Sequence, residues 1–335
     1  MNLLFIGGTG TISTDLVDYA IRQGAAISVL NRGNRAESLP ADANLIQGDM
    51  TNEADIAAKL ACKHFDVIVD FISFVPADIE RAYRLFAGKT AQYVFISSAT
   101  VYEKPPKCVP ITEETPLGNP FWDYAQNKES CERKLAELAQ TSGFPYTIIR
   151  PSHTYCNRSV PVAIHGDNGS FQVIARILAK KPIIIPGDGT SLWTLTHSRD
   201  FAPLIWPVFG NAQAIGEAYH VTSSQALSWN EIHDQIGYAL GQPVEKVHIP
   251  SPLLAKLDAK FEKELLGDKA HSLIFDNTKV RSLTEIPHTC KPFTHWIGGV
   301  VETVLNEPRY QPRDPAFDTW CDETIDAWQK ATTTL

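Results

Sequence analysis

The sequence predicts an α/β protein with a doubly wound parallel sheet and a smaller, mixed α/β C-terminal part. Three observations predict this fold. An apolar strand at residues 2–6 leads into a glycine-rich turn, strand-like and helix-like segments alternate up to residue 150, and the regularity ends beyond it. Such alternation implies parallel strands with helices on both faces and a ligand at the carboxyl ends of the strands.

The regular part of the chain contains the strands of this sheet. We expect them near residues 2–6, 26–31, 43–47, 66–70, 91–97 and 145–149, with helical segments between most of them. Parallel strands end at the same edge of a sheet, so the residues that follow them should converge there. These residues are Gly7, Asn31, Asp70, Ser98 and Arg150.

A glycine-rich turn follows the first strand directly. Gly7, Gly8 and Gly10 precede a helical pattern that Gly24 ends, and strand, glycine turn and helix in this order are typical of a dinucleotide site. Gly7 allows the tight turn, and Gly10 lets a pyrophosphate approach the backbone at the helix N-terminus. Ser13 stands where a third glycine is usual, and its small side chain still permits close packing of the helix on the strand.

The end of the second strand bears on the choice of dinucleotide. An acidic residue here would bind the ribose hydroxyls of NAD and repel the 2′-phosphate of NADP. This chain has Asn31, then Arg32, with Arg35 close behind, so the charge favours NADP over NAD. Arg32 as a solvated loop arginine is the alternative. Asp49 follows the third strand and is expected near the adenine, unless it is only a turn residue.

A tyrosine and a lysine four residues apart form the candidate catalytic centre. Tyr124 and Lys128 share one face of the helix expected over 121–141. A fixed ammonium nearby favours phenolate, so we expect Lys128 to lower the pKa of Tyr124 from about 10. Ser98, upstream, is suited to hold the oxygen of an alcohol or ketone while the tyrosine moves the proton.

The C-terminal part gives weaker signals. Ser228 and Glu231 match the capping-box pattern that opens a helix, and Gly241 is suited to end that helix. The last segment carries an apolar stripe at helical spacing, which predicts a helix packed on the core. The stripe consists of Phe317, Trp320, Cys321, Ile325 and Trp328.

Length and composition bound the classes of protein. At 335 residues the chain is long enough for two domains. We expect an NAD(P)-binding Rossmann domain over 1–155, with return segments near 190–222, and a mainly substrate-binding domain over 156–335. The net charge of −8, without a Lys/Arg cluster, argues against nucleic acid as a partner.

The same composition favours a cytoplasmic protein. The absence of a run of eighteen apolar residues, and a first strand that starts at residue 2, predict neither a membrane span nor a signal peptide. The six cysteines are scattered without metal-ligand spacing. We therefore expect reduced thiols and no metal.

Five motifs in a fixed order connect the chain with a known family. They are Gly7-x-x-Gly10, Ser98-Ala-Thr-Val-Tyr102, Tyr124-x-x-x-Lys128, Ile149-Arg150-Pro151 and Thr196-His-Ser-Arg-Asp-Phe-Ala202. With them the chain resembles the extended short-chain dehydrogenases/reductases and, more narrowly, the NAD-dependent epimerase/dehydratase family. The resemblance extends from residue 2 to about residue 222.

The resemblance implies a Rossmann-like fold and a role for each matching residue. Lys128 would hold the nicotinamide ribose, Tyr124 would be the acid/base, and Ser98 would be its hydrogen-bonding partner. The dinucleotide would contact Gly7, Gly8, Thr9, Gly10, Thr11, Ile12, Asn31, Arg32, Asp49, Phe71, Lys128 and Pro151. Many relatives dimerise through the helix that carries the tyrosine and lysine, which leaves a homodimer open.

Departures from the family pattern narrow the substrate. Ala99 and Thr100 replace the Asp-Glu pair of the dehydratases, so that elimination mechanism lacks its groups. The string that starts at Ser98 resembles UDP-galactose 4-epimerases, but Trp193 stands where those enzymes carry a diphosphate-binding arginine. His153 stands where an asparagine often binds the sugar. We expect substrate contacts at Ser98, Thr100, His153 and Trp193.

The main hypothesis is an NAD(P)-dependent oxidoreductase or epimerase acting on a secondary alcohol or ketone of a sugar or sugar-nucleotide. The motifs alone do not separate a hydride that is returned from one that is kept. Two alternatives stay open. One is a non-catalytic NAD(P)-binding regulator. The other is an RNA-binding protein of the chloroplast stem-loop-binding type, which the Asn-Arg-Gly segment at 31–33 resembles.

Overall fold

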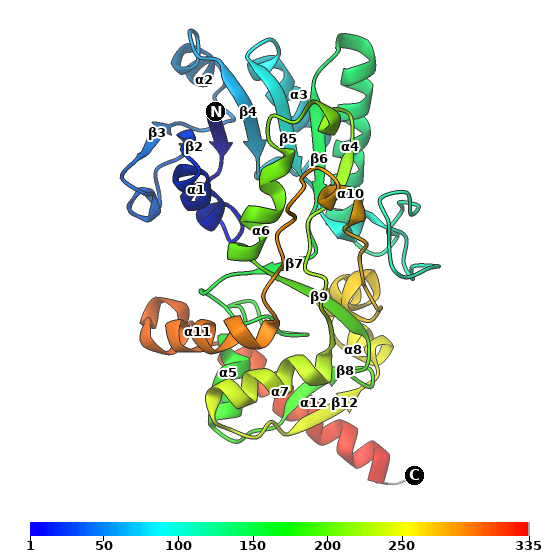
Figure 1. Ribbon diagram of the computed structural model, residues 1–335. Coiled ribbons are helices and arrows are strands. Elements are labelled where there is room, and N and C mark those ends of the chain that lie inside the picture. The colour runs from blue at the N-terminus through cyan, green and yellow to red at the C-terminus, as the bar shows by residue number, and fades with distance from the viewer. Residues whose placement is uncertain (334–335) are drawn as a thin grey trace.

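Seven parallel strands form the central sheet of the protein, which is seen in a computed structural model that describes residues 1–333 (Figure 1). Their spatial order is β10-β6-β5-β4-β1-β2-β3, and every neighbouring pair is parallel. The strands are β1 (Asn2–Ile6), β2 (Ala26–Asn31), β3 (Ala43–Gln47), β4 (Phe65–Asp70), β5 (Thr90–Ile96), β6 (Tyr146–Arg150) and β10 (Ala218–His220). The predicted strands are therefore confirmed to within one residue at each end, and β10 joins them from the expected return segment.

Alternation along each strand explains why helices cover both faces of the sheet. Leu3 and Phe5 of β1 point into one core cluster, and Leu4 and Ile6 point into another. The first cluster is closed by α1 (Ser13–Arg22) and α6 (Ser198–Ile205), and the second by α2 (Glu53–Lys59), α3 (Pro76–Phe86) and α4 (Asp123–Ser142). The chain order reverses between β1 and β4, which is the place where doubly wound sheets bind ligands.

A second group of elements lies below this sheet in Figure 1. Three strands form one small sheet, β11-β9-β7, and two form another, β12-β8. The strands are β7 (His153–Tyr155), β8 (Ile183–Pro186), β9 (Leu192–His197), β11 (Ala226–Ser228) and β12 (Lys246–Ile249). The helices are α5 (Phe171–Leu178), α7 (Trp229–Leu240), α8 (Ser251–Leu257), α9 (Ala259–Phe261), the π-helix η5 (Glu262–Lys269), α11 (Phe293–Asn306) and α12 (Pro315–Thr333). The short helix α10 (Thr278–Arg281) instead packs on β10 and α6 beside the central sheet.

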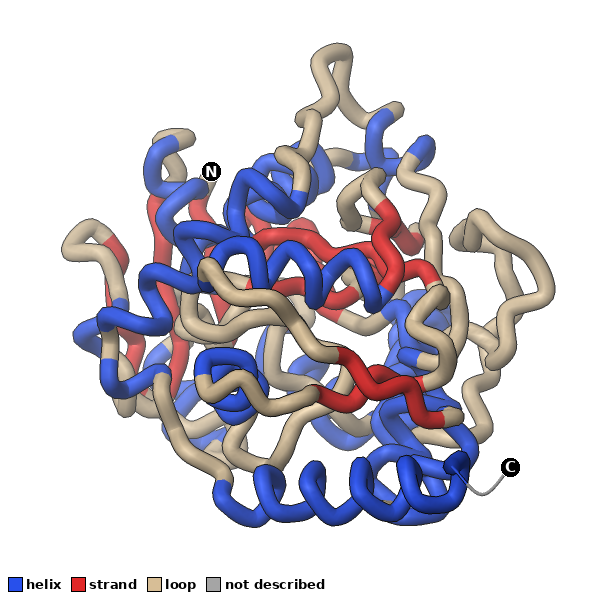
Figure 2. Tube along the Cα trace, turned by 90° about the horizontal axis from the view of Figure 1, so that it is seen from below, coloured by secondary structure: helices blue, strands red, loops and turns tan. Residues whose placement is uncertain are grey.

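Short 3₁₀ helices connect these elements. They are η1 (Ala36–Ser38), η2 (Ala99–Val101), η3 (Trp206–Val208), η4 (Ala212–Ala214) and η6 (Pro308–Tyr310). The N-terminus begins β1 of the central sheet, and α12 lies at the opposite end of the molecule (Figure 1). Figure 2 shows the same arrangement from below. Within residues 1–333, no helix combines the length and the apolar character needed to cross a membrane.

The two C-terminal signals of the sequence are confirmed. Ser228 Oγ accepts the amide hydrogen of Glu231 at 3.2 Å, and the Glu231 carboxylate accepts that of Ser228 at 2.8 Å, so the capping box opens α7. Gly241 ends α7 in the left-handed region, at φ +65°. A third core cluster lies within the lower group of elements, and the apolar stripe of α12 packs on it, with Cys321 only 2% exposed.

A buried ion pair joins α4 to the carboxyl end of the sheet. Arg150 Nη2 donates to Glu132 Oε2 at 2.7 Å, and both side chains are less than a tenth exposed. Ser97, at the end of β5, donates to Glu132 Oε1 at 2.5 Å, and Arg150 Nη1 donates to the Tyr102 hydroxyl at 2.8 Å. Every member has a partner, which is the condition under which buried charges hold a fold together.

Replacement of Glu132 by alanine should destabilise the protein strongly. The substitution leaves the Arg150 guanidinium buried without its counter-charge, a loss of about 3–5 kcal/mol in the free energy of unfolding. Glu137→Ala on the same helix is the matched control, because Glu137 is 60% exposed and pairs with Lys134 at the surface. It should cost less than about 1 kcal/mol. Chemical denaturation measures both, and equal losses would contradict the argument.

Candidate active site

The glycine turn after β1 needs residues without a side chain. Gly7 and Gly8 have φ angles of +114° and +72°, which strongly favour glycine. A Cβ on Gly8 would also lie 2.4 Å from Cγ1 of Val29. The amide of Gly10 donates to Ser13 Oγ at 2.8 Å, and Ser13 is buried at the start of α1. The turn therefore presents bare backbone at a helix N-terminus, which suits a pyrophosphate.

A cleft of about 640 Å³ opens in front of this turn. It runs along the carboxyl ends of β1, β2, β3 and β4 and reaches Phe74, just before α3. Of the predicted dinucleotide contacts, those that line it are Gly7, Thr9, Gly10, Asn31, Arg32, Asp49 and Phe71. Gly8 packs beneath the turn against β2, Ile12 packs on the core beside α1, and Thr11 lines a neighbouring hollow. Gly7 and Gly10 expose bare backbone to this cleft, which leaves room for a phosphate group to approach the turn.

Asn31 and Arg32 differ in what they can offer a ribose. Asn31 Nδ2 donates to the carbonyl of Gly7 at 3.2 Å, and Asn31 Oδ1 accepts the amide hydrogen of Gly33 at 2.8 Å, so this side chain braces the glycine turn. The Arg32 side chain is exposed, and among residues 1–333 its guanidinium has no hydrogen bond or ion pair. It stands between the cleft and a second hollow of about 770 Å³.

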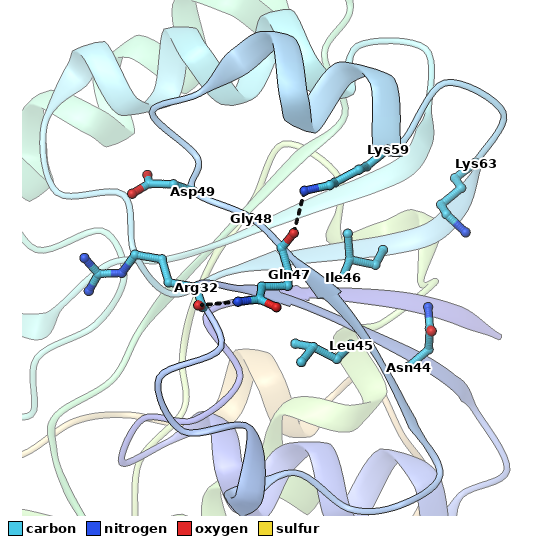
Figure 3. Close-up of a pocket in the computed structure, with 9 residues that line it drawn as sticks. All are labelled: Arg32, Asn44, Leu45, Ile46, Gln47, Gly48, Asp49, Lys59 and Lys63. Carbon is cyan, nitrogen blue, oxygen red and sulfur yellow. Dashed lines mark hydrogen bonds between the residues drawn. The ribbon is translucent and has the colours of Figure 1, made fainter.

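Figure 3 shows this second hollow at the outer edge of β3. Gln47 Nε2 donates to the Arg32 carbonyl at 3.2 Å, and Lys59 Nζ donates to the Gln47 carbonyl at 2.8 Å. Asp49 Oδ1 accepts the amide and hydroxyl hydrogens of Thr51, and these bonds lower the pKa of Asp49. Asp49 is thus a turn residue, and it lines the cleft as well.

The candidate catalytic residues meet at the ends of β5 and α4. Thr100 Oγ1 donates to Ser98 Oγ at 2.9 Å, and the Ser98 hydroxyl lies close enough to the Tyr124 phenol to lower its pKa. Lys128 lies one turn further along α4, with its ammonium 5.9 Å from the centre of the Tyr124 ring. Lys128 Nζ donates to the backbone carbonyls of Ser73 and Ile96, both at 2.8 Å.

The expected acidity of Tyr124 is corrected by the structure. Burial raises the pKa of Tyr124, the hydrogen bond with Ser98 lowers it, and the charge of Asp268 raises it further. Lys128 is not among the groups that shift this pKa, and its ammonium turns toward two carbonyls and the ring of Phe74, 4.5 Å away. Burial also lowers the pKa of Lys128 to about 8. The phenol is therefore protonated at neutral pH.

Asp70 has a supporting role that the sequence analysis did not assign. It is fully buried at the end of β4, and Oδ1 accepts the amide hydrogens of Ile72 at 2.8 Å and Ser73 at 3.0 Å. Oδ2 accepts the hydroxyls of Ser73 and Tyr93. These bonds shape the loop whose Ser73 carbonyl holds Lys128. An acidic residue directly after the apolar run of residues 67–69 was the available signal.

The expected substrate contacts are more deeply placed. Trp193 is 2% exposed, packs on Trp229 with ring centres 5.2 Å apart, and donates its indole N–H to the Lys269 carbonyl at 3.3 Å. His153 meets the Trp193 ring edge-on at 6.0 Å. Burial, Lys269 and a further histidine lower the pKa of His153 to about 3, so its imidazole is neutral. Neither side chain carries charge for a diphosphate.

Two other arginines lie near the glycine turn. Arg158 Nη1 donates to the Thr9 carbonyl at 3.4 Å, and Arg199 lies 3.6 Å from the Asp15 carboxylate of α1. Both guanidinium groups therefore belong to the dinucleotide side of the protein. A glycine turn, a cleft at the switch point of the sheet and a Ser-Tyr-Lys group at the strand ends together define a dinucleotide-dependent enzyme.

Comparison with known proteins agrees with this class. The family model described as "NAD dependent epimerase/dehydratase family" matches residues 3–222. The 2′-dehydrokanamycin reductase of Streptomyces kanamyceticus is 24% identical over 79% of this chain and 74% of its own length. The chloroplast stem-loop binding protein of 41 kDa b of Arabidopsis thaliana is 23% identical over 73% of this chain and 65% of its own length.

Solved structures show the same fold. The UDP-glucuronic acid 4-epimerase of Bacillus cereus, in complex with UDP-glucuronic acid and NAD, superposes with a TM-score of 0.72 at 17% identity. The match covers 91% of this chain and 99% of that one. The chain belongs to the NAD-dependent epimerase/dehydratase family and is an enzyme of the extended short-chain dehydrogenase/reductase type.

Dinucleotide affinity should fall as the pH rises through about 8. The pKa of Lys128 is about 8, so its ammonium is charged below that pH and loses its charge above it. If the charged form holds the ribose, titration of NADPH by fluorescence gives the tightest binding near pH 6–7. Lys128→Met should weaken binding about tenfold or more and remove the pH dependence. Lys134→Met, on the same helix, is the control and should keep the wild-type profile.

Proposed function

We propose that this enzyme transfers a hydride between NADP and a carbon that bears a secondary alcohol or ketone in a sugar. This proposal depends on one observation, which is that Ser98, Tyr124 and Lys128 lie together beside the dinucleotide cleft. The dinucleotide supplies or accepts the hydride. Ser98 holds the substrate oxygen, Tyr124 moves its proton, and Lys128 binds the ribose and orients the cofactor against Tyr124.

The protonation state of Tyr124 supports the reductive direction. A general acid must carry its proton before the step, and the raised pKa keeps the phenol protonated at neutral pH. Ketone reduction then ends with proton transfer from the phenol to the developing alkoxide, which Ser98 holds. Epimerisation uses the same residues with the hydride returned to the other face, and it is the second candidate outcome.

The surroundings of Trp193 support an unphosphorylated sugar as the substrate. A nucleotide-sugar brings a diphosphate, which proteins usually bind with arginine. The family position for that arginine is a buried indole here, and Arg158 and Arg199 are engaged at the glycine turn and at α1. The test substrate for this proposal is 2′-dehydrokanamycin, which appears in the name of a reductase similar to this chain. UDP-glucose is the contrasting test substrate, because it carries a diphosphate.

The preference for NADP is part of the same proposal. Asn31 places no negative charge at the ribose, and the Arg32 guanidinium at the cleft has no partner among residues 1–333. A 2′-phosphate would supply that partner. We also propose that residues 1–155 with the segment 190–222 carry the cofactor and that 156–335 mainly carry the substrate.

Neither alternative class has comparable support. Resemblance to a chloroplast stem-loop binding protein favours RNA as a ligand. However, affinity for RNA depends on contacts between basic side chains and phosphates, and this chain has a net charge of −8. A regulator would not need the Ser98–Tyr124 contact or the buried Lys128.

Tyr124→Phe should reduce the rate of NADPH-dependent ketone reduction by about 10²–10⁴-fold, because the substitution removes the proton and keeps the ring. The rate is measured from the loss of NADPH absorbance at saturating 2′-dehydrokanamycin. The affinity for NADPH should be unchanged. Trp122→Phe is the control, since its ring neighbours Tyr124 at 5.4 Å without a proton to give. Full activity of Tyr124→Phe would refute the assignment.

The cofactor preference should follow the charge at residues 31 and 32. Arg32→Ala should raise the KM for NADPH about tenfold and leave the KM for NADH nearly unchanged, because only NADPH carries the 2′-phosphate. Asn31→Asp removes the donor to the Gly7 carbonyl and so should weaken both cofactors, but NADPH more, because the new charge also repels the 2′-phosphate. Steady-state kinetics with both cofactors measures this, and Lys63→Ala, which lines only the outer hollow, is the control. Equal losses for both cofactors would contradict NADP specificity.

A further inference from the structure

A π-helix covers the end of α4 that carries Tyr124. The helix is η5 (Glu262–Lys269), and a Cβ on its Gly267 would lie 3.3 Å from the Cβ atoms of both Phe121 and Trp122. The absence of a side chain at Gly267 therefore lets η5 pack closely against the start of α4. Runs of π-helix are rare and are often found at functional sites.

Asn119 connects this π-helix to the catalytic serine. Asn119 Nδ2 donates to the carbonyl of Gly267 at 2.7 Å and to that of Thr100 at 2.9 Å. Thr100 Oγ1 in turn donates to Ser98 Oγ at 2.9 Å. Asn119 itself is 1% exposed. The π-helix is therefore held in register with the group that would bind the substrate oxygen.

Asp268 follows Gly267 in the chain and lies between two anchored carbonyl groups, of which the first is that of Gly267. The second anchor is the carbonyl of Lys269, which accepts the indole N–H groups of Trp193 at 3.3 Å and Trp229 at 3.0 Å. Asp268 is 8% exposed, and after burial its negative charge is the other influence that raises the pKa of Tyr124. Its neighbour Gly267 is tied through Asn119 to Thr100, which donates to Ser98, so Asp268 lies on the part of η5 next to the catalytic group.

A buried lysine faces the same carboxylate. The Lys104 side chain is 0% exposed, and its Nζ lies 3.8 Å from Asp268 Oδ1, too far for a normal hydrogen bond. Among residues 1–333 this ammonium has no hydrogen-bond partner. A buried charge with unmade hydrogen bonds is costly, so such a group calls for a functional explanation.

The charges around Asp268 nearly balance. Lys104 faces it from the loop after η2, Lys269 and Glu264 from the π-helix, and Tyr124 from α4. Burial raises the pKa of Asp268 to about 6, and Lys104 opposes that rise. Above that pH the carboxylate is ionised, and in residues 1–333 no other side chain donates to it within normal hydrogen-bond distance.

We propose that Asp268 binds the sugar beside its reacting carbon, accepting hydrogen bonds from a hydroxyl or ammonium group of the substrate. Lys104 is the positioning residue that keeps this carboxylate ionised and oriented. The inference rests on the proposed function and narrows its substrate class. A sugar that offers hydrogen-bond donors at this position is accepted, and one that offers a carboxylate there is repelled.

The test compares Asp268→Asn, which removes the charge and keeps the shape, with Lys104→Met in NADPH-dependent reduction of 2′-dehydrokanamycin. In the wild type kcat/KM should fall below pH 6, as Asp268 takes up a proton; this fall is the acid limb of the pH profile. Asp268→Asn should raise KM at least about tenfold with little change in kcat and should abolish the acid limb. Lys104→Met should move that limb to higher pH, because the pKa of Asp268 rises without its ammonium.

Two further variants separate binding from folding. Lys104→Met/Asp268→Leu replaces the pair by apolar groups, which is often neutral for stability. It should unfold near the wild-type temperature and still show the raised KM. Lys263→Met/Asp123→Asn removes an exposed ion pair between η5 and α4, 3.4 Å long, and should keep the wild-type KM.

The outcomes are distinguishable. Suppose that the wild type is active and that Asp268→Asn is folded, with unchanged KM and unchanged acid limb. That result would overturn this inference alone, and the pair of Lys104 and Asp268 would then have only a structural role. A wild type inactive on both the keto sugar and UDP-glucose would overturn the proposed function and this inference with it.

Discussion

One ammonium and two backbone carbonyls hold the catalytic edge of the protein together. Lys128 is 2% exposed and donates to the carbonyl of Ile96, at the end of β5, and to that of Ser73, in the loop after β4. Hydrogen bonds to two carbonyls offset much of the cost of burying an ammonium. The bonds thus fix α4 against two neighbouring strands, and Tyr124 is placed by the same helix.

The support behind these bonds extends to other parts of the sheet. Asp70 orders the loop that offers the Ser73 carbonyl, and the Glu132–Arg150 pair joins the same helix to β6. Both groups are buried and fully hydrogen-bonded, so they resist small displacements. Geometry at the strand ends is therefore set by polar contacts inside the protein, while the cleft side of the edge stays open for a dinucleotide.

Electrostatics around Tyr124 favour a proton donor. Phe74 and Trp122 lie beside the Tyr124 ring, and the π-helix adds the negative charge of Asp268. Low water content and a nearby carboxylate both disfavour phenolate. The pKa of a catalytic tyrosine in this fold thus depends on what covers it from the C-terminal part, as well as on the lysine one turn away.

The sheet was predictable because its signals are local. Apolar runs such as 2–6 and 91–97, separated by helical periodicity, fix where strands lie, and parallel connection fixes the edge at which they end. The C-terminal part was not predictable to the same degree. Its strands have three to six residues, β7 and β9 pair across about forty residues of chain, and the π-helix has no apolar period that a sequence pattern could reveal.

The sequence by itself determined the order of the elements, the glycine turn and the convergence of Ser98, Tyr124 and Lys128. Those features follow from spacing along the chain, and spacing is visible in a sequence. Only the tertiary structure decided that the Tyr124 pKa is raised, that Trp193 belongs to the core and that Asp268 faces the phenol. Each of these depends on desolvation and on charges from residues remote in sequence, and their proximity arises only when the chain is folded.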